Sequence, residues 1–306
     1  MSKSIIIVSP PPEYGGSLVE FKLCSLLNEK GFNSKILLFR KNFCCRHHVF
    51  FVRFILHLKF FIQSFLFNFK NAILKKKWPI ECKFKISPFV SKNTIVIYPE
   101  IVYGNPLMAK KIVRWFLFHN RYPNDPNAYG KNELSFAFRE IFNDPKYNPT
   151  CRLLKINHFD ATLYKQTNFG ERNGNCYILR KGKGRSDLPK EFDGPIIDNL
   201  PEDEKVAVFN RCKYCFDYDT QTFYTTIACV CGCIPIVVME AGKTKSDYLG
   251  KNGKDWGRAY GNTPEQIEYA IKTRQKRIDM LNFEESNKQN VNRFIQELNK
   301  FFDLNI

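Results

Sequence analysis

The sequence predicts an α/β protein with parallel sheets, and three features of the chain support this prediction. The chain opens with a strand–helix–strand pattern over residues 4–39, in which Gly31 ends the helix. A second such pattern spans residues 212–239, where Gly232 separates a helix from the apolar strand Ile234–Met239. Strands and helices alternate through the second half of the chain, and 306 residues are enough for two domains of ordinary size. Repeated alternation is typical of parallel sheets covered by helices on both faces.

The composition indicates a folded protein with an acidic partner. Hydrophobic residues make up 44% of the chain, which is enough to build buried cores. The formal net charge of +17 predicts binding to nucleic acid, to an anionic lipid surface or to phosphorylated small molecules, and charge alone does not choose among them. The chain starts directly with a short apolar strand, and its 11 cysteines are scattered. We therefore expect a cytoplasmic protein with reduced thiols.

The first domain is predicted to span residues 1–118. Its opening loop contains Gly15 and Gly16, which allow a ligand to approach the backbone closely, although two glycines are also common in an ordinary strand-to-helix turn. A strand is predicted over residues 93–99, and a helix over Leu107–Leu117 is predicted to end the domain.

An aromatic and basic insert over residues 43–78 interrupts this domain. Its central part, residues 49–70, is the most aromatic part of the chain, and Arg53 and Lys59 argue against a membrane-spanning helix. Two interpretations stay open. The segment is either a helix at an anionic membrane surface, aided by the lysines at 75–77, or a helix that packs its Phe face on the domain core.

The second domain is predicted to span residues 119–280, and residues 281–306 are predicted to form a C-terminal helix. The turn-rich run 121–131 is interpreted as a linker because of its prolines, asparagines and glycine. The strands expected ahead of residue 212 are Leu134–Phe138, Arg152–Ile156 and Cys176–Leu179, and the expected helix is Glu202–Asn210.

The unit at residues 212–239 is predicted to hold a phosphate group. We expect its helix to span Thr220–Cys231, directly after Asp219, with the hydroxyls of Thr220 and Thr222 in its first turn. Helix N-termini have unpaired N–H donors and a partial positive charge. In open α/β sheets, moreover, ligands lie at the carboxyl ends of the strands.

Further residues near the same strand ends complete the expected donor site. Arg180 and Lys181 follow a predicted strand, and we expect the loop 180–185 to clamp a diphosphate, although such a loop can also be a solvated basic turn. Tyr218 could stack on a base or a sugar, and Glu240, which follows the last apolar strand, could contact the sugar.

Two patterns raise the question of a metal site. Asp217 and Asp219 form an Asp-x-Asp pattern, but Asp219 precedes the expected helix, where an N-cap role is the simpler account. A group of cysteines has spacings that raise the possibility of a zinc site. No histidine lies nearby, so we expect these thiols to pack as small hydrophobic groups. These are Cys212, Cys215, Cys229, Cys231 and Cys233. We expect neither a metal nor a cofactor.

Glu100 is the candidate catalytic residue. It follows a predicted apolar strand and could orient or deprotonate an acceptor hydroxyl, while the alternative is a structural ion pair with Arg114. His119 and His158 are weaker candidates for a base.

Two strings of residues resemble signatures of bacterial surface-polysaccharide glycosyltransferases. The first is Tyr98-Pro99-Glu100-Ile101 with Gly104-Asn105-Pro106-Leu107 and Val113-Arg114-Trp115, and the second runs from Tyr218-Asp219-Thr220 to Cys231-Gly232-Cys233-Ile234-Pro235. The resemblance implies the GT-B fold, in which two Rossmann-like domains face a central cleft and a C-terminal helix crosses back to the first domain. It also implies that the first domain binds the acceptor and the second binds the nucleotide sugar, with Asn105 and Arg114 on the acceptor side. The chain lacks a Glu-x7-Glu pair, so the resemblance leaves the stereochemistry of transfer open.

The sequence thus predicts a metal-independent glycosyltransferase. Its expected substrates are a nucleotide-diphosphate sugar and a lipid-linked, lipopolysaccharide or capsule glycan, and it is expected in the cytoplasm or on the inner face of the membrane. The alternative is a basic nucleic-acid-binding α/β protein without catalysis. Against this alternative, the aromatic residues cluster in one apolar segment. A nicotinamide-dependent enzyme is disfavoured because the first loop lacks Gly-x-Gly-x-x-Gly.

Overall fold

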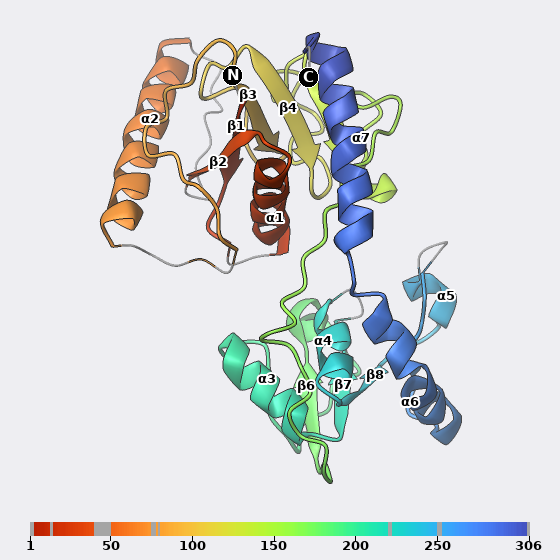
Figure 1. Ribbon diagram of the computed structural model, residues 1–306. Helices are drawn as coiled ribbons and strands as arrows, with labels where there is room; N and C mark the ends of the chain where they lie inside the picture. Colours follow the sequence, from red (N-terminus) through yellow and green to blue (C-terminus); the bar gives the residue numbers. More distant parts are fainter. Residues whose placement is uncertain are drawn as a thin grey trace. The chain divides into compact units, whose positions relative to one another are not determined.

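The chain folds into two α/β units, as the computed structural model shows for residues 3–12, 15–39, 50–74, 78, 80–219, 222–249 and 253–304 (Figure 1). Unit 1 consists of Met1–His158 and Glu284–Ile306, and unit 2 consists of Phe159–Phe283. Each unit contains one parallel sheet, which confirms the predicted α/β class and the two Rossmann-like domains.

Unit 1 contains a five-stranded sheet in the order β2-β1-β3-β4-β5. The strands are β1 (Ser4–Ser9), β2 (Asn33–Leu38), β3 (Ile95–Pro99), β4 (Lys111–Phe116) and β5 (Leu134–Ala137). The strand order reverses between β1 and β3, and the carboxyl ends of strands at such a reversal are where open α/β sheets bind ligands.

Two helices cover one face of this sheet, namely α1 (Gly15–Glu29) and α7 (Glu284–Phe302) (Figure 1). In α7 the buried residues Val291, Phe294 and Leu298 recur at helical spacing, so they form one stripe that packs on the core of unit 1. The ring of Phe294 meets Phe136 of β5 edge to face, with ring centroids 5.0 Å apart. The prediction that the C-terminal helix returns to the first domain is therefore confirmed.

Helix α2 (Phe50–Ile73) packs on the opposite face of the sheet, where Phe60 is buried against the second core of unit 1. Its Asn68 side chain pairs with the edge strand β2: Nδ2 donates to the carbonyl of Leu38 at 2.8 Å, and the Leu38 N–H donates to Oδ1 at 3.0 Å. Because an edge strand has unpaired backbone groups, this side chain satisfies groups that would otherwise be buried without partners. Packing of the insert on the domain core, one of the two interpretations of this segment, is thus observed for one side of α2.

Unit 2 contains a four-stranded sheet in the order β6-β7-β8-β9. Buried thiols of Cys212, Cys215, Cys231 and Cys233 contribute to its core, in agreement with the expectation that they pack as small hydrophobic groups. The elements are β6 (Asn175–Ile178), β7 (Tyr214–Asp217), β8 (Ile234–Val237), β9 (Ala259–Tyr260), α3 (Glu202–Arg211), α4 (Tyr224–Val230), α5 (Lys245–Tyr248) and α6 (Pro264–Asp279). Two short 3-10 helices, η1 (Glu140–Phe142) in unit 1 and η2 (Arg180–Gly184) in unit 2, complete the assignment for the described residues.

The predicted helix over Leu107–Leu117 is wrong, because Lys111–Phe116 forms the strand β4 in the interior of the sheet. Its apolar residues Ile112, Val113 and Trp115 are β-branched or aromatic and pack well on a pleated surface. Pairing with β3 and β5 on both sides then outweighs the helical spacing that the segment also shows.

The predicted domain boundary after residue 118 is also wrong. Strand β5 pairs with β4, so the chain leaves unit 1 only after His158. The expected linker 121–131 belongs to unit 1, where Ala128 and Tyr129 are buried in the core. Of the expected strand at 152–156, the structure shows a single bridge between Leu153 and Ala137.

None of the helices in the described part of the chain has both the length and the hydropathy that crossing a bilayer requires.

Truncation of Phe294 should destabilise unit 1 strongly. The Phe294→Ala variant leaves a cavity between α7 and β5, so we expect its free energy of unfolding to fall by about 3–5 kcal/mol in urea denaturation. The matched control is Phe301→Ala on the same helix, where the side chain is 45% exposed and the expected change is within about 0.5 kcal/mol. Equal losses in the two variants would contradict the assigned packing of α7.

Candidate functional site

The candidate donor site lies at the carboxyl ends of β6, β7 and β8 in unit 2, where η2 follows β6 directly. Three cations of the loop 180–185 are paired with aspartates. The shortest N···O distances are 3.6 Å for Arg180 with Asp219, 3.4 Å for Lys183 with Asp198, and 2.6 Å for Arg185 with Asp187. The structure thus brings together Arg180 and Asp219, which the sequence placed on separate strand ends.

The cations of this loop differ in how accessible they are. The side chains of Arg180 and Lys183 are 45% and 56% exposed, and Lys181 is also exposed. Arg180 lies with its guanidinium carbon 5.2 Å from the centre of the Tyr224 ring, at the start of α4. An anion could therefore reach these three cations from solvent.

Arg185 has a structural role instead. Its side chain is only 10% exposed, and its guanidinium donates to the carbonyls of Tyr218 at 3.3 Å and Val238 at 2.8 Å. These carbonyls directly follow β7 and β8, so Arg185 joins the two strand ends. The Tyr218 ring is buried beside this guanidinium, in a cluster with Tyr177 and Leu179, instead of lying on the surface as a stacking platform.

Asp217 and Asp219 occupy the end of β7. The Asp219 N–H donates to Oδ1 of Asp217 at 2.9 Å, and the second oxygen of Asp217 is buried without a hydrogen-bond partner in the described part of the chain. Burial, together with the charge of Asp219, raises the pKa of Asp217 well above its usual value. Arg258 opposes this shift, and its Nη2 donates to Oγ1 of Thr226 at 2.9 Å.

The helix predicted to begin at Thr220 begins later, at Tyr224. The hydrogen bond between the Asp219 N–H and Asp217 forms an Asx-type turn, which competes with helix formation directly after the strand. Thr222 precedes the helix, and its Oγ1 accepts from the Tyr224 N–H at 3.2 Å. Phosphate binding at the start of this seven-residue helix stays a prediction, and Thr220 lies outside the described residues.

Asp198 is a site residue that the sequence interpretation missed. Its carboxylate accepts from the backbone N–H groups of Leu179 and Arg180 at 3.0 and 2.7 Å, so it caps the donors at the end of β6. Gly182 brings the same loop against β7, because a Cβ atom there would lie 2.3 Å from the carbonyl oxygen of Tyr218. Glu240 is exposed beyond the end of β8, and its backbone N–H donates to the Tyr248 hydroxyl at 2.7 Å.

In unit 1, Glu100 lies where the sequence places it, directly after β3. Its carboxyl group is buried, with Oε2 accepting from the Leu117 N–H at 2.9 Å. Burial raises the pKa of Glu100 above its usual value, because the charged form loses its hydration.

A second buried carboxyl group, Glu20 of α1, lies near the same strand ends. The Ser9 hydroxyl donates to Oε2 of Glu20 at 2.6 Å, and Oε1 is buried without a partner in the described residues. Burial raises the pKa of Glu20 well above its usual value, and the charge of Glu100 adds to this effect. The sequence contains a signal for this burial. Glu20 lies one helical turn before Leu23 and Cys24, among the apolar positions of the predicted helix.

The two glycines of the opening loop lie at the start of α1, since Gly15 is its first residue. A Cβ atom on Gly16 would meet only the Leu117 side chain, at an ordinary contact distance of 3.7 Å. The structure therefore provides no steric reason for a glycine at position 16, and a ligand role for Gly15 and Gly16 stays a prediction.

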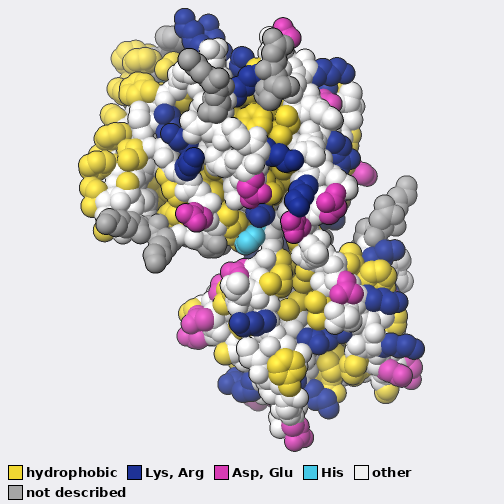
Figure 2. All heavy atoms as spheres, viewed as in Figure 1, with side chains coloured by type: hydrophobic (Ala, Val, Ile, Leu, Met, Phe, Trp, Pro, Cys, Tyr) yellow, Lys and Arg dark blue, Asp and Glu magenta, His cyan; other side chains and the backbone are white. Residues whose placement is uncertain are grey.

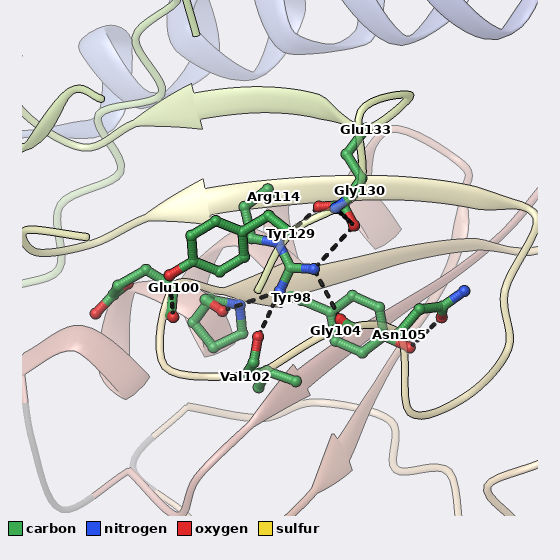
Figure 3. A network of polar contacts seen from close by, with 10 residues as sticks. Tyr98, Glu100, Val102, Gly104, Asn105, Arg114, Tyr129, Gly130 and Glu133 are labelled. Carbon is green, nitrogen blue, oxygen red and sulfur yellow. Dashed lines mark hydrogen bonds and ion pairs between the residues drawn. The ribbon is translucent and has the colours of Figure 1, made fainter. Parts of the chain in front are cut away.

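Arg114 lies at the centre of a polar network in unit 1 (Figure 3). It is fully buried and forms a bidentate ion pair with Glu133, at 2.8 and 3.1 Å. Its remaining N–H groups donate to the carbonyls of Val102 at 2.8 Å, Gly104 at 2.9 Å and Pro99 at 3.5 Å. Since every N–H of the guanidinium is engaged, Arg114 has a structural role in place of the predicted acceptor-side role, and its partner is Glu133 and not Glu100.

Asn105 is engaged within the same loop. Its Oδ1 accepts from the Tyr98 hydroxyl at 3.0 Å and from the Ala109 N–H at 2.9 Å, and its Nδ2 donates to the Ala109 carbonyl at 2.8 Å. These bonds close the turn between β3 and β4. The expectation that Asn105 faces an acceptor stays a prediction.

Within the described ranges, no group of three or more histidine, cysteine, aspartate or glutamate side chains is arranged to hold a metal ion. The nine cysteines that the structure describes are free thiols.

Comparison with models of known protein families finds no match for this chain, and comparison with curated proteins finds none either. Among solved structures, the chain is similar to the glycosyltransferase of kitacinnamycin, with 9% identity, 98% of this chain and 96% of that chain covered, and a TM-score of 0.35. It is also similar to the spinosyn forosaminyltransferase SpnP (10% identity, 98% and 95% covered, TM-score 0.35). A third similar structure is the glycosyltransferase SnogD from Streptomyces nogalater (10% identity, 98% and 96% covered, TM-score 0.34). At these identities and TM-scores the likeness carries no conclusion about activity, and the fold class rests on the strand pairing of the chain itself.

Substitution of Glu20 should change how stability depends on pH. In the folded protein the pKa of Glu20 is raised, so between its unfolded and folded pKa values the native state binds more protons, and the free energy of unfolding falls as pH rises. The Glu20→Gln variant lacks this contribution, so its stability relative to the wild type should increase as pH rises from 5 to 8 in urea denaturation.

The control for this measurement is Glu29→Gln, which removes an exposed carboxylate from the same helix and should change stability by less than about 0.5 kcal/mol. A Glu20→Gln variant that loses stability relative to the wild type as pH rises would contradict the raised pKa.

Proposed function

We propose that the protein is a glycosyltransferase that uses a nucleotide-diphosphate sugar and binds the donor diphosphate at the ends of β6 and β7. The observation that supports this most directly is the set of exposed cations on η2, Arg180, Lys181 and Lys183, at the carboxyl ends of a parallel sheet. Glycosyl transfer leaves negative charge on the departing diphosphate, and cations held at that position stabilise it.

The pairing of these cations with aspartates is compatible with diphosphate binding. The Arg180–Asp219 and Lys183–Asp198 pairs have long N···O distances of 3.6 and 3.4 Å, and one partner in each pair is about half exposed. Exposed pairs of this kind contribute roughly 0–1 kcal/mol, so a diphosphate of higher charge can compete for the cations. In the free protein, the aspartates would keep the long side chains in place for the ligand.

We propose that Glu100 is the general base that removes the proton from the acceptor hydroxyl. A general base works best when its pKa lies near the working pH, and burial moves the pKa of this carboxyl group in that direction. With cations in place of a metal ion at the diphosphate, the proposed reaction needs no metal and no cofactor.

The resemblance of the two sequence signatures supports a lipid-linked, lipopolysaccharide or capsule glycan as the acceptor. Such an acceptor would place the protein in the cytoplasm, at the inner face of the membrane.

Removal of the exposed cations should weaken donor binding. We expect the Arg180→Ala/Lys181→Ala double variant to bind nucleoside diphosphates at least tenfold more weakly than the wild type in calorimetric titration, a loss of about 1.4 kcal/mol. The matched control is Lys190→Ala, which removes an exposed cation of the same unit outside η2 and should leave the affinity unchanged. Salt-sensitive binding of oligonucleotides, together with no affinity for nucleoside diphosphates, would support the nucleic-acid-binding alternative.

Replacement of the proposed base should slow transfer without affecting donor binding. We expect Glu100→Gln to lower kcat by about 10²–10⁴-fold, because the amide cannot accept the acceptor proton, and to leave the Kd of the donor diphosphate unchanged. The measurement is release of nucleoside diphosphate in the presence of a lipid-linked glycan acceptor. An unchanged kcat in a folded variant would rule out this role for Glu100.

A further inference from the structure

Helix α2 presents a continuous apolar face to solvent. Nine of its large hydrophobic side chains are between 41% and 69% exposed, and they recur at spacings of three and four residues, with two adjacent pairs among them. They are Phe51, Phe54, Ile55, Leu58, Ile62, Phe65, Leu66, Phe69 and Ile73. At about 3.6 residues per turn, these positions fall within roughly 120° of arc, so they form a single stripe along the helix. We call this stripe the α2 apolar face.

The buried side of α2 is the more polar one. Ser64 and Asn68 are each only 3% exposed, and Asn68 is held by its two hydrogen bonds to Leu38 of β2. A surface helix of a globular protein normally has the reverse arrangement, with apolar residues inside and polar residues outside. The hydrogen bonds of Asn68 and the burial of Phe60 in the second core of unit 1 hold the helix in this orientation, so the stripe of nine apolar residues faces solvent.

Neighbouring aromatic residues extend and order the α2 apolar face. Phe65 and Phe69 stack with ring centroids 5.8 Å apart, and the 73% exposed Phe89 contacts Phe61 edge to face at 5.4 Å. Figure 2 shows hydrophobic side chains gathered along the edge of unit 1 where Figure 1 places α2. A contiguous apolar surface of this kind marks an interaction site.

The charges near the face indicate which partner covers it. Residues 50–73 include no aspartate or glutamate, and Lys59 and Lys70 are exposed beside the stripe. The whole chain has a formal net charge of +17, so the partner is expected to be anionic as well as apolar. A second copy of the chain meets the apolar requirement, but its α2 offers no carboxylate to pair with these lysines.

We propose that the α2 apolar face docks on an anionic lipid bilayer. The helix lies in the plane of the interface, with its Phe, Leu and Ile side chains in the boundary between headgroups and acyl chains. Lys59 and Lys70 reach the lipid phosphates along their aliphatic stems. This inference does not depend on the proposed transferase activity, and it names the surface by which the protein would reach a lipid-linked acceptor.

The test is sedimentation of the full-length chain with vesicles of phosphatidylglycerol and phosphatidylcholine. We expect the Leu58→Glu/Phe65→Glu variant to bind at least tenfold more weakly than the wild type. The matched control is Phe169→Glu, which changes an 81% exposed aromatic residue of unit 2 and should bind as the wild type does. Circular dichroism verifies the fold of each variant, and the nucleoside diphosphate affinity is measured separately, so loss of docking is distinguished from loss of donor binding.

A second readout uses Phe65→Trp, whose indole fluorescence should shift to the blue on addition of these vesicles and be quenched by brominated acyl chains. Wild-type protein that does not sediment with the vesicles would overturn the proposal. So would equal binding by the wild type and the Leu58→Glu/Phe65→Glu variant. A wild-type dimer in light scattering that the same variant converts to a monomer, without vesicle binding by either, would assign the face to a second copy of the chain.

Discussion

The structure depends on buried arginines that satisfy backbone carbonyls at the ends of parallel strands. In unit 1, Arg114 of β4 binds the carbonyls of Pro99, Val102 and Gly104 and pairs with Glu133 ahead of β5. A buried guanidinium is stable only if its charge is paired and its donors are used, and both conditions are met here. The loop that follows β3, and with it Glu100, is held by this network.

Unit 2 also contains an arginine that donates to backbone carbonyls at the ends of parallel strands. Arg185 binds the carbonyls that follow β7 and β8, and Gly182 allows the η2 loop to lie directly against Tyr218. The exposed cations Arg180 and Lys183 then extend from a loop whose backbone is fixed at both of these points. The loop 180–185 thus contains one structural cation, Arg185, and accessible cations such as Arg180 and Lys183. The difference between them is burial of the side chain.

Because some cations are buried, the formal net charge is larger than the positive charge that a partner can reach. The formal net charge of +17 includes Arg114 and Arg185, whose donors bind the chain's own carbonyls and carboxylates. The cations available to a partner are those left at the surface, and they include the ones on η2 and beside the α2 apolar face. These surfaces differ in kind, because the first is polar and surrounded by aspartates while the second is apolar and lacks acids.

The sequence alone predicted the α/β class, the two strand–helix–strand units at residues 4–39 and 212–239, and the C-terminal helix. These features follow from local periodicity and from glycines that end helices, so they need no knowledge of distant residues. It also placed Glu100, Arg180 and Asp219 at strand ends. Tertiary structure decided that residues 111–116 form a strand, because pairing with β3 and β5 outweighs the helical pattern. Contacts between segments distant in sequence likewise set the unit boundary, the burial of Glu20 and Arg114, and the orientation of α2 through Asn68 and Leu38. Burial and pairing depend on neighbours across the sheet, and no local pattern specifies those neighbours.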